Sequence, residues 1–394
     1  MKIKTYDNQF IEFDLPPGIK TENLLAIPGI IDPHVHFRTP GAEYKENWET
    51  GARAAIAGGV TGVFDMPNNS PSVTDKEILA EKKEIIRQQL QKTGIPLRHY
   101  FYFGATAGNA GKIENVKNEI IGIKMFMGAS TGDLLVDKYE DQEKIFKKAA
   151  ELDLVVSVHA ESDAIIKENQ AKFSNPALAD HSKIRSREAA VAAVMQAIGL
   201  AKKFGTKLYI CHVSTKEEIE LIKKAKSDGQ KIYAEVAPHH LFLDESDYEN
   251  LGTKAQMNPP VRTTKDREIL WQALNDGTID TIGTDHAPHT LEEKAKPYPL
   301  SPSGVTGIET MLPLMLNAHN QRKISLEKIV ELTSTNIQKI FGFPESGDWT
   351  LINPNLEKEV KNENLKTKCK WSPFAGRILK GWPVGIILNN KFYN

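Results

Sequence analysis

Short apolar runs alternate along this chain with longer stretches in which apolar residues recur every three to four positions. The short runs predict buried strands, and the periodic stretches predict amphipathic helices. The predicted strands are Ala26–Ile31, Val60–Asp65, Arg98–Gly104, Gly122–Phe126, Val155–His159, Lys207–Val213, Ile232–Val236 and Thr281–Thr284. The helices predicted between several of them are Lys76–Lys92, Asp141–Leu152, Ser186–Phe204 and Glu217–Ser227.

This alternation predicts βαβ units and therefore an α/β fold with a parallel sheet. Eight strands favour a closed (β/α)8 barrel of the TIM type, which we expect to occupy residues 26–345. The two ends differ, because residues 1–25 and 346–394 carry only short strand-like patterns separated by turns. Neither end is long enough to bury a core of its own. We therefore expect both ends to build one small β domain together.

Charge and cysteine content narrow the classes of function. The 394 residues include 50 Lys+Arg and 51 Asp+Glu, so no basic surface is available to gather nucleic acid or anionic lipid. No apolar run approaches the roughly 18 residues that a membrane span needs. Only two cysteines occur, Cys211 and Cys369, which excludes a disulfide framework and predicts a cytoplasmic location. A small-molecule substrate fits this composition best.

Two histidines are spaced for a shared metal ion. His34 and His36 form a His-x-His pair at the end of a predicted strand. Residues i and i+2 of a strand point to the same face, so both imidazoles can reach one ion. The alternative is an unrelated pair of surface or core histidines. The pair alone does not decide between them.

Three more metal-binding side chains follow predicted strands: His159, His212 and Asp285. Barrel enzymes place their catalytic groups at the carboxyl ends of the strands. Packing at a strand end can explain one such residue, but it does not explain several together. Imidazole and carboxylate ligands suit zinc, with manganese, iron or cobalt as alternatives.

Lys124 is unusual because it lies inside an apolar strand. Lysine is almost never fully buried unless it is paired. One interpretation is an ion pair with a nearby carboxylate. The other is a lysine carboxylated by CO₂, whose carbamate bridges two metal ions. This modification requires the neutral amine, which burial beside cations favours.

Motifs along nearly the whole chain resemble the cyclic amidohydrolases, and the dihydroorotase family in particular. The resemblance begins at Pro28–Arg38, with its His-Val-His-Phe-Arg sequence. It continues, in order, through Asp65–Asn68, Ile123–Gly128, Val158–Glu161, Cys211–Thr215, Pro238–Leu241, Met257–Arg262, Gly283–His289 and Ser372–Arg377.

The resemblance implies a role for each matching residue. His34, His36 and Asp285 would hold a first metal, His159 and His212 a second, and carboxylated Lys124 would bridge the two. Two Zn²⁺ ions per chain are the implied cofactors. The implied substrate-binding residues are Arg38, Asn68 and His289, which would bind the substrate carboxylate.

The implied reaction is the reversible cyclisation of N-carbamoyl-L-aspartate to (S)-dihydroorotate and water, in de novo pyrimidine (UMP) biosynthesis. A metal lowers the pKa of water from 15.7 to about 7. The resemblance therefore implies attack by a metal-activated hydroxide, with Asp285 as the catalytic proton carrier. A homodimer and an association with aspartate transcarbamoylase are further expectations of the resemblance.

Two alternatives remain open. Hydantoinases, dihydropyrimidinases and allantoinases act on neutral rings, whereas Arg38 suits a substrate carboxylate because a guanidinium binds it bidentately. A non-catalytic, dihydroorotase-like scaffold would be expected to lose ligands, and here all the ligand positions are filled. We also expect the segments His289–Ser303, Ser301–Gly307 and Gly128–Val136 to lie over the site.

Overall fold

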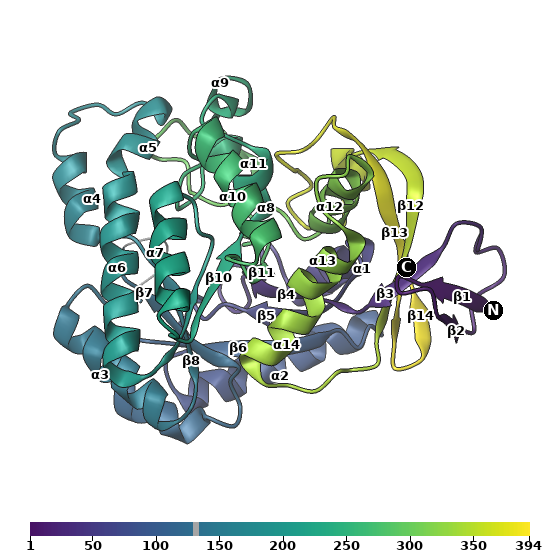
Figure 1. The fold of residues 1–394 in the computed structure, drawn as a ribbon, viewed down its shortest axis with the longest axis horizontal. Coiled ribbons are helices and arrows are strands. Elements are labelled where there is room, and N and C mark those ends of the chain that lie inside the picture. Colours follow the sequence, from purple (N-terminus) through teal and green to yellow (C-terminus); the bar gives the residue numbers. More distant parts are fainter. Residues whose placement is uncertain (129–133) are drawn as a thin grey trace.

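The computed structural model describes residues 1–128 and 134–394. These described residues form two sheets (Figure 1). The larger has eight strands in the order β4 to β11, and every ladder in it is parallel. Its strands are β4 (Ile30–Val35), β5 (Val60–Asp65), β6 (Arg98–Gly104), β7 (Gly122–Phe126), β8 (Val155–His159), β9 (Lys207–Ile210), β10 (Ile232–Val236) and β11 (Thr281–Ile282). The expected barrel strands are thereby confirmed.

The predicted strand 26–31 is wrong in its extent, because it divides into two strands of different sheets. β3 (Leu25–Pro28) pairs with a C-terminal strand, whereas β4 pairs with β5. Gly29 lies between them and donates its backbone N–H to the carbonyl of Asp348 at 2.8 Å. A Cβ here would lie 2.5 Å from Thr61 Oγ1, so only glycine fits this crossing.

The sheet closes between β4 and the segment that follows β11. Val35 and His286 form a parallel bridge, and the His36 N–H donates to the His286 carbonyl at 2.9 Å. Below them, Asp32 Oδ1 accepts the Thr284 N–H at 2.9 Å. Closure brings the first and last barrel strands together, as a (β/α)8 barrel requires.

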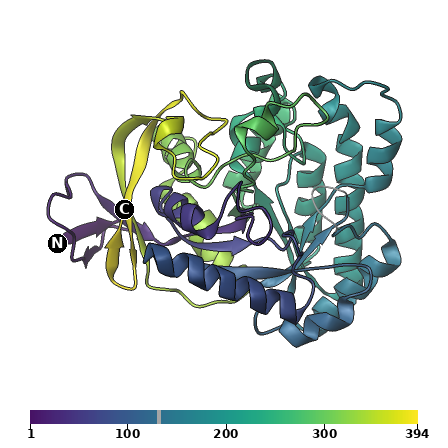
Figure 2. The same ribbon diagram turned by 180° about the vertical axis from the view of Figure 1, so that it is seen from behind.

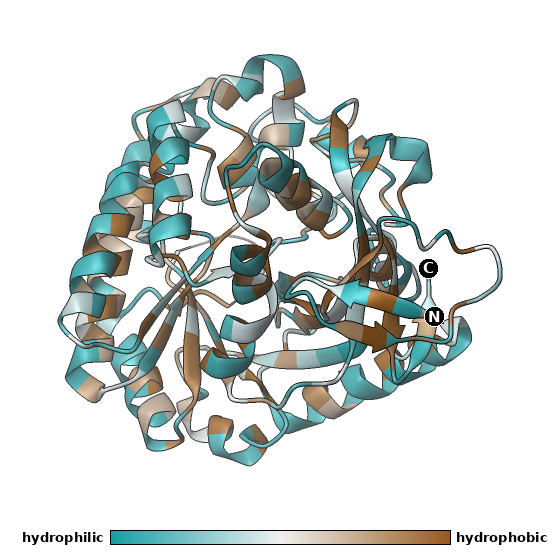
Figure 3. Ribbon diagram, turned by 45° about the vertical axis from the view of Figure 1, so that its right-hand side comes forward, coloured by the Kyte–Doolittle hydropathy of each residue, from teal (hydrophilic) through white to brown (hydrophobic). Residues whose placement is uncertain are grey.

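Helices form the outer layer of the barrel (Figures 1 and 2). In Figure 3 the strands are largely brown and the outer helices largely teal, because the helices turn polar faces to solvent. The main helices are α1 (Trp48–Ala57), α2 (Lys76–Thr93), α3 (Tyr139–Glu151), α4 (Asp163–Gln170), α6 (Arg187–Phe204), α7 (Lys216–Ser227), α10 (Thr264–Asp276), α12 (Met311–Asn320), α13 (Leu326–Val330) and α14 (Asn336–Phe341). The shorter ones are η1 (Ala110–Val116), η2 (Leu178–Asp180), α5 (His181–Ile184), α8 (Pro238–Phe242), α9 (Asp247–Leu251), η3 (Gly252–Ala255), α11 (Leu291–Lys294), the π-helical η4 (Glu331–Thr335) and η5 (Asn362–Asn364).

Both chain termini build the second sheet, as expected from the sequence. Its order is β14-β13-β12-β3-β1-β2, so N-terminal strands lie beside C-terminal ones. They are the purple and yellow strands at one side of Figure 1. The additional strands are β1 (Lys2–Thr5), β2 (Phe10–Glu12), β12 (Trp349–Glu359), β13 (Ile378–Leu388) and β14 (Lys391–Tyr393).

Two loop expectations need comment. The segment 289–303 is not entirely irregular, because it contains α11, whose N-cap Thr290 accepts the Glu293 N–H. Of the segment 128–136, residues 129–133 lie outside the described residues. Within the described part of the chain, no helix is both long and apolar enough to cross a membrane.

Candidate active site

The six expected metal ligands meet at the carboxyl ends of the barrel strands, where they line one cavity with Arg38. They lie on, or within three residues after, five strands: β4, β7, β8, β9 and β11. All six are buried. They are His34, His36, Lys124, His159, His212 and Asp285. Closure of the barrel thus brings together residues up to 251 positions apart in the chain.

His34, His36 and Asp285 form a compact ligand set. Their ligand atoms all lie within 4.8 Å of one another. Asp285 Oδ1 is 3.0 Å from His36 Nε2 and 3.3 Å from His34 Nε2. Two imidazole nitrogens and a carboxylate oxygen converging on one point are the ligand types of a zinc site. The described side chains therefore fit a metal ion here.

Three of the expected histidine ligands have a hydrogen-bond partner at the ring nitrogen that would not bind the metal. His34 Nδ1 lies 2.8 Å from Glu235 Oε1, and His36 Nδ1 lies 2.7 Å from Asn68 Oδ1. His159 Nε2 lies 2.9 Å from Glu161 Oε2. Such partners hold the ring proton and leave the other nitrogen for a metal.

Two of these hydrogen-bond partners, the carboxylates of Glu235 and Glu161, are site residues that the sequence reasoning missed. Glu235 lies on β10, and no motif links it to His34, 201 residues away. Glu161 stands two residues after His159 and forms an ion pair with Arg185. Its proximity in the sequence was a usable signal. Asn68 was expected to bind substrate, and here its Oδ1 accepts from His36.

His159 and His212 face each other across the second half of the cavity. His159 Nδ1 is 3.1 Å from His212 Nε2. His212 Nδ1 is buried and has no hydrogen-bond partner among the described residues. The two nitrogens that face each other, His159 Nδ1 and His212 Nε2, are of the type that can bind one cation together.

Lys124 is completely buried, and the expected alternative of an ion pair is not found. No carboxylate oxygen of a described residue lies within 4.0 Å of Lys124 Nζ. Its nearest polar partner is Cys211 Sγ, at 3.0 Å. A buried ammonium without a counter-charge is costly, whereas a carbamate between two cations is not. The surroundings of Lys124 therefore favour the modified side chain.

Cys211 corrects a simple application of strand alternation. Because it neighbours His212, alternation predicts that Cys211 points to the opposite face of the strand and packs in the core, and Cys211 is indeed buried in a hydrophobic cluster. Cys211 nevertheless contacts Lys124, and its Sγ lies within 4.8 Å of ligand atoms of His34 and Glu235. His212 has φ +39°, a left-handed conformation that turns its own side chain into the barrel as well.

Arg38 and Asp285 share this left-handed backbone, with φ of +58° and +45°. Non-glycine residues in this region each cost about 1–3 kcal/mol, and they persist where surrounding contacts hold them. Three such residues border one cavity, each directly after a barrel strand or its extension. The backbone is therefore strained at three residues whose side chains line the cavity.

Burial keeps most of the imidazoles neutral, which is the form that binds metal. It lowers the pKa of His36 to about 4, and it also lowers the pKa values of His159 and His212. His34 differs, because Glu235 and Asp285 outweigh its burial and raise its pKa to about 10. Neighbouring His34 and His36 hold the pKa of Asp285 well below its usual range despite its burial.

A cationic cluster borders the cavity beside these ligands. Arg38 donates from Nε to the Pro288 carbonyl at 3.2 Å, and its Nη2 lies 3.2 Å from His289 Nε2. Lys45 Nζ lies 3.0 Å from His289 Nδ1. Arg38 therefore stands beside both the ligand set and His289.

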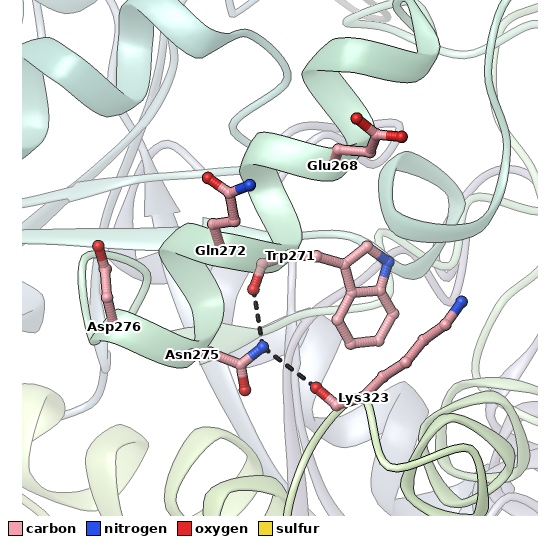
Figure 4. Close-up of a pocket in the computed structure, with 6 residues that line it drawn as sticks. All are labelled: Glu268, Trp271, Gln272, Asn275, Asp276 and Lys323. Carbon is pink, nitrogen blue, oxygen red and sulfur yellow. Dashed lines mark hydrogen bonds between the residues drawn. The ribbon is translucent and has the colours of Figure 1, made fainter.

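A wider groove lies elsewhere, on the outer face of α10 (Figure 4). Its residues include Trp271, Asn275 and Lys323, and Asn275 Nδ2 donates to the carbonyls of the other two. The lining side chains bring no histidine, cysteine or buried acid. The chemistry of the molecule is therefore concentrated in the smaller cavity of the barrel.

Comparison with known proteins defines the class. Residues 25–348 match the sequence model of the Amidohydrolase family. The chain is 36% identical over 380 residues to a dihydroorotase of Methanosarcina mazei, covering 91% of this chain and 81% of that one. It is 34% identical to the multifunctional protein CAD of Squalus acanthias, covering 96% of this chain and 16% of that protein. Among solved structures, an L-hydantoinase from Arthrobacter aurescens matches with a TM-score of 0.90 at 28% identity, covering 96% and 88% of the two chains.

The chain belongs to the amidohydrolase family, as the family match and the extended identity to the dihydroorotases demonstrate. The barrel and its second sheet agree with the solved cyclic amidases of that family.

Proposed function

We propose that this chain is a dihydroorotase, which interconverts N-carbamoyl-L-aspartate and dihydroorotate. The observation that carries the proposal is the arrangement of Arg38 and His289 directly beside the ligand set of His34, His36 and Asp285. A metal site alone suits any cyclic amidase. A guanidinium at its edge suits a ring that bears a carboxylate. The identity of about 36% to a curated dihydroorotase supports the same substrate.

In this proposal His34, His36 and Asp285 hold one metal ion, His159 and His212 hold a second, and carboxylated Lys124 bridges them. Zinc suits these ligands. Metal ions at this position supply Lewis acidity and a lowered pKa for bound water. Glu235, Asn68 and Glu161 keep three of the imidazoles in the tautomer that presents the inner nitrogen.

Asp285 is the proposed proton carrier. In the hydrolytic direction a proton must leave the attacking water and reach the departing ring nitrogen. The Asp285 carboxylate is ionised and stands at the cavity between His34 and His36, so it can accept the first proton and donate the second. Arg38, Asn68 and His289 bind the substrate carboxylate and so place the scissile amide near this oxygen.

The first experiment measures metal per chain and turnover of dihydroorotate on one purified sample. We expect about two zinc ions per chain together with loss of the ultraviolet absorbance of dihydroorotate. Turnover of hydantoin or dihydrouracil but not of dihydroorotate would replace this proposal with a neutral-ring amidase. No metal and no turnover after incubation with zinc and bicarbonate would leave the non-catalytic scaffold.

The bridging role of Lys124 has its own test. Lys124→Ala should lower the second metal occupancy and nearly abolish activity, and added short carboxylic acids should restore part of both. Lys82 is not a suitable control position, because it is also fully buried. The control variant is Lys207→Ala, because Lys207 pairs with Asp153 at the surface. Full activity of Lys124→Ala would contradict the carbamate bridge.

A neutral-ring amidase is the second candidate, favoured by the TM-score of 0.90 to an L-hydantoinase. Arg38 argues against this candidate, because a neutral ring offers no carboxylate to the guanidinium.

Several finer expectations remain part of this proposal. They are the domain division at residues 25 and 345, a cytoplasmic location, a homodimer and an association with aspartate transcarbamoylase. The likeness to the CAD protein supports the last of these, because that relative is named as multifunctional.

A further inference from the structure

Lys45 is a partly buried cation with no role in the proposed reaction so far. It lies between β4 and α1, and its side chain is 14% exposed. Lys45 Nζ lies 3.0 Å from His289 Nδ1 and 3.0 Å from Glu293 Oε1. Its backbone carbonyl accepts from Cys369 Sγ at 2.9 Å, which fixes the main chain at this residue. Lys45 is therefore held against the ring of His289.

His289 is neutral in this setting. Burial, followed by the charges of Arg38 and Lys45, lowers its pKa far below the usual value. A neutral imidazole carries its proton on one nitrogen only, so the two ring nitrogens must differ in role. The partners around the ring decide which nitrogen carries the proton.

An Nε2–H tautomer satisfies two contacts. Nδ1 then accepts from the Lys45 ammonium at 3.0 Å, and Nε2–H donates to the Ser303 carbonyl at 3.1 Å. Gly304 packs so closely behind this ring that a Cβ there would lie 3.1 Å from His289 Cδ2. The Ser303 carbonyl is thereby held in place.

An Nδ1–H tautomer is worse with Lys45 present. Two donors, Nδ1–H and the ammonium, would then face each other, and the bare Nε2 would face the Ser303 carbonyl oxygen. It would gain a bond from Arg38 Nη2, 3.2 Å away, and would turn Nδ1–H toward Glu293 Oε2 at the longer distance of 3.6 Å. The bond from Arg38 would also occupy a guanidinium N–H that a substrate carboxylate needs.

We propose that Lys45 is a positioning residue that holds His289 in the Nε2–H tautomer and so keeps the Arg38 guanidinium free of the His289 lone pair and available to a substrate carboxylate. The role of the carboxylate rests on the proposed function, whereas the tautomer does not. Without Lys45, His289 can turn its Nε2 lone pair to Arg38, and the site loses a guanidinium donor.

The test compares Lys45→Met with Lys45→Arg, which keeps a cationic donor, and with Lys92→Met, which removes an exposed lysine paired with Glu49. All are full-length, zinc-loaded protein. The ¹⁵N shifts of His289 report its tautomer without substrate, and its signals are assigned by their loss in His289→Gln. We expect the Nε2–H form in the wild type and in Lys92→Met, its loss in Lys45→Met, and its return in Lys45→Arg.

Kinetics supply the second readout. Loss of a charge-assisted hydrogen bond should raise KM for dihydroorotate about tenfold or more in Lys45→Met. We expect kcat to change much less, because Lys45 does not touch the reacting atoms, and Lys45→Arg to recover most of the loss. A merely structural role would lower kcat and thermal stability with the tautomer unchanged.

The outcomes separate the two proposals. An unchanged tautomer in Lys45→Met, or an unchanged KM in a variant that has switched tautomer, overturns the role of Lys45. A wild type that is inactive on dihydroorotate overturns the proposed function, and the NMR comparison then still decides what Lys45 does to His289.

Discussion

At the scale of single residues, the position of a proposed metal ligand depends on the residue that forms a hydrogen bond with it. Glu235 contacts His34 Nδ1 at 2.8 Å and also accepts the His212 N–H at 3.0 Å and the Tyr209 hydroxyl at 2.9 Å. One buried carboxylate thus orients a ligand of each proposed metal ion. Strand alternation brings Glu235 into the barrel, yet nothing in its local sequence distinguishes it from a structural acid.

Glu235→Gln should therefore weaken metal binding by roughly 10–100-fold, the usual effect of losing a carboxylate behind a histidine ligand. The amide preserves the shape but no longer holds the His34 proton as a charged acceptor. Competition with a zinc chelator measures the change. Glu220→Gln, at an exposed pair with Lys216, is the matched control, and equal zinc affinity in both variants would contradict the role.

At the scale of elements, the loop after β5 is fixed by a buried ion pair. Lys82 Nζ on α2 lies 2.5 Å from Asp65 Oδ2 and 2.6 Å from Asn69 Oδ1. Asp65 also accepts the Phe37 N–H at 2.9 Å, which joins this loop to the end of the metal-binding strand. Asn68 lies within the loop, so the pair sets its position beside His36.

Lys82→Met should destabilise the protein by about 3–5 kcal/mol, because it leaves the Asp65 charge buried and unpaired. The double variant Asp65→Asn with Lys82→Met should recover a large part of this loss. Denaturant unfolding of the three proteins measures both effects. Equal stability of the single and double variants would mean that the charge of Asp65 is not what makes the single variant costly.

Another element depends on pH. Glu309 accepts the N–H groups of Lys366 and Thr367 at 2.9 Å and so holds the C-terminal segment against the barrel. Burial raises its pKa to about 7, although these bonds oppose the rise. The unfolded carboxyl titrates near 4.3. Between these values the folded chain binds more protons, so this group makes stability fall as pH rises.

Glu309→Gln should remove that contribution. Relative to the variant, wild-type stability should decline from pH 5 to pH 7 by up to about 1.4 kcal/mol per pH unit. Unfolding curves at several pH values give the difference, in which the metal ligands cancel because both proteins carry them. Parallel curves would contradict a shifted Glu309.

How much the sequence could predict follows from these same elements. β5 to β8 and β10 have the predicted bounds, because short apolar runs between turns leave little choice. His34 lies in β4, and His36 and Asp285 lie within three residues after strands, so their place at the carboxyl end of the barrel was predictable from the strand pattern. Glu235 and Lys45 lie against partners that only barrel closure brings close, and a linear pattern contains no such distance. Cys211 and His212 do not point to opposite faces, because the left-handed backbone at His212 breaks the alternation.

At the scale of the whole molecule, the C-terminal segment reaches across to the mouth of the site. Trp371 is fully buried, and its Nε1 donates to the His289 carbonyl at 2.7 Å. Thr367 Oγ1 donates to Glu46, which also lies 3.4 Å from His286 Nε2. Strands β12 and β13 meanwhile pair with each other and, through β3, with the N-terminal end.

These contacts determine the order in which parts of the site can form while the chain is synthesised. A ribosome makes Lys45 early and Trp371 late, and at about 5–20 residues per second roughly half a minute separates them. All the barrel strands and proposed metal ligands have been synthesised once residue 285 is added. Trp371, whose indole donates to the His289 carbonyl, is added only when the chain is nearly finished. A nascent chain can therefore assemble its proposed metal ligands before the end of the site proposed to bind the carboxylate is in place.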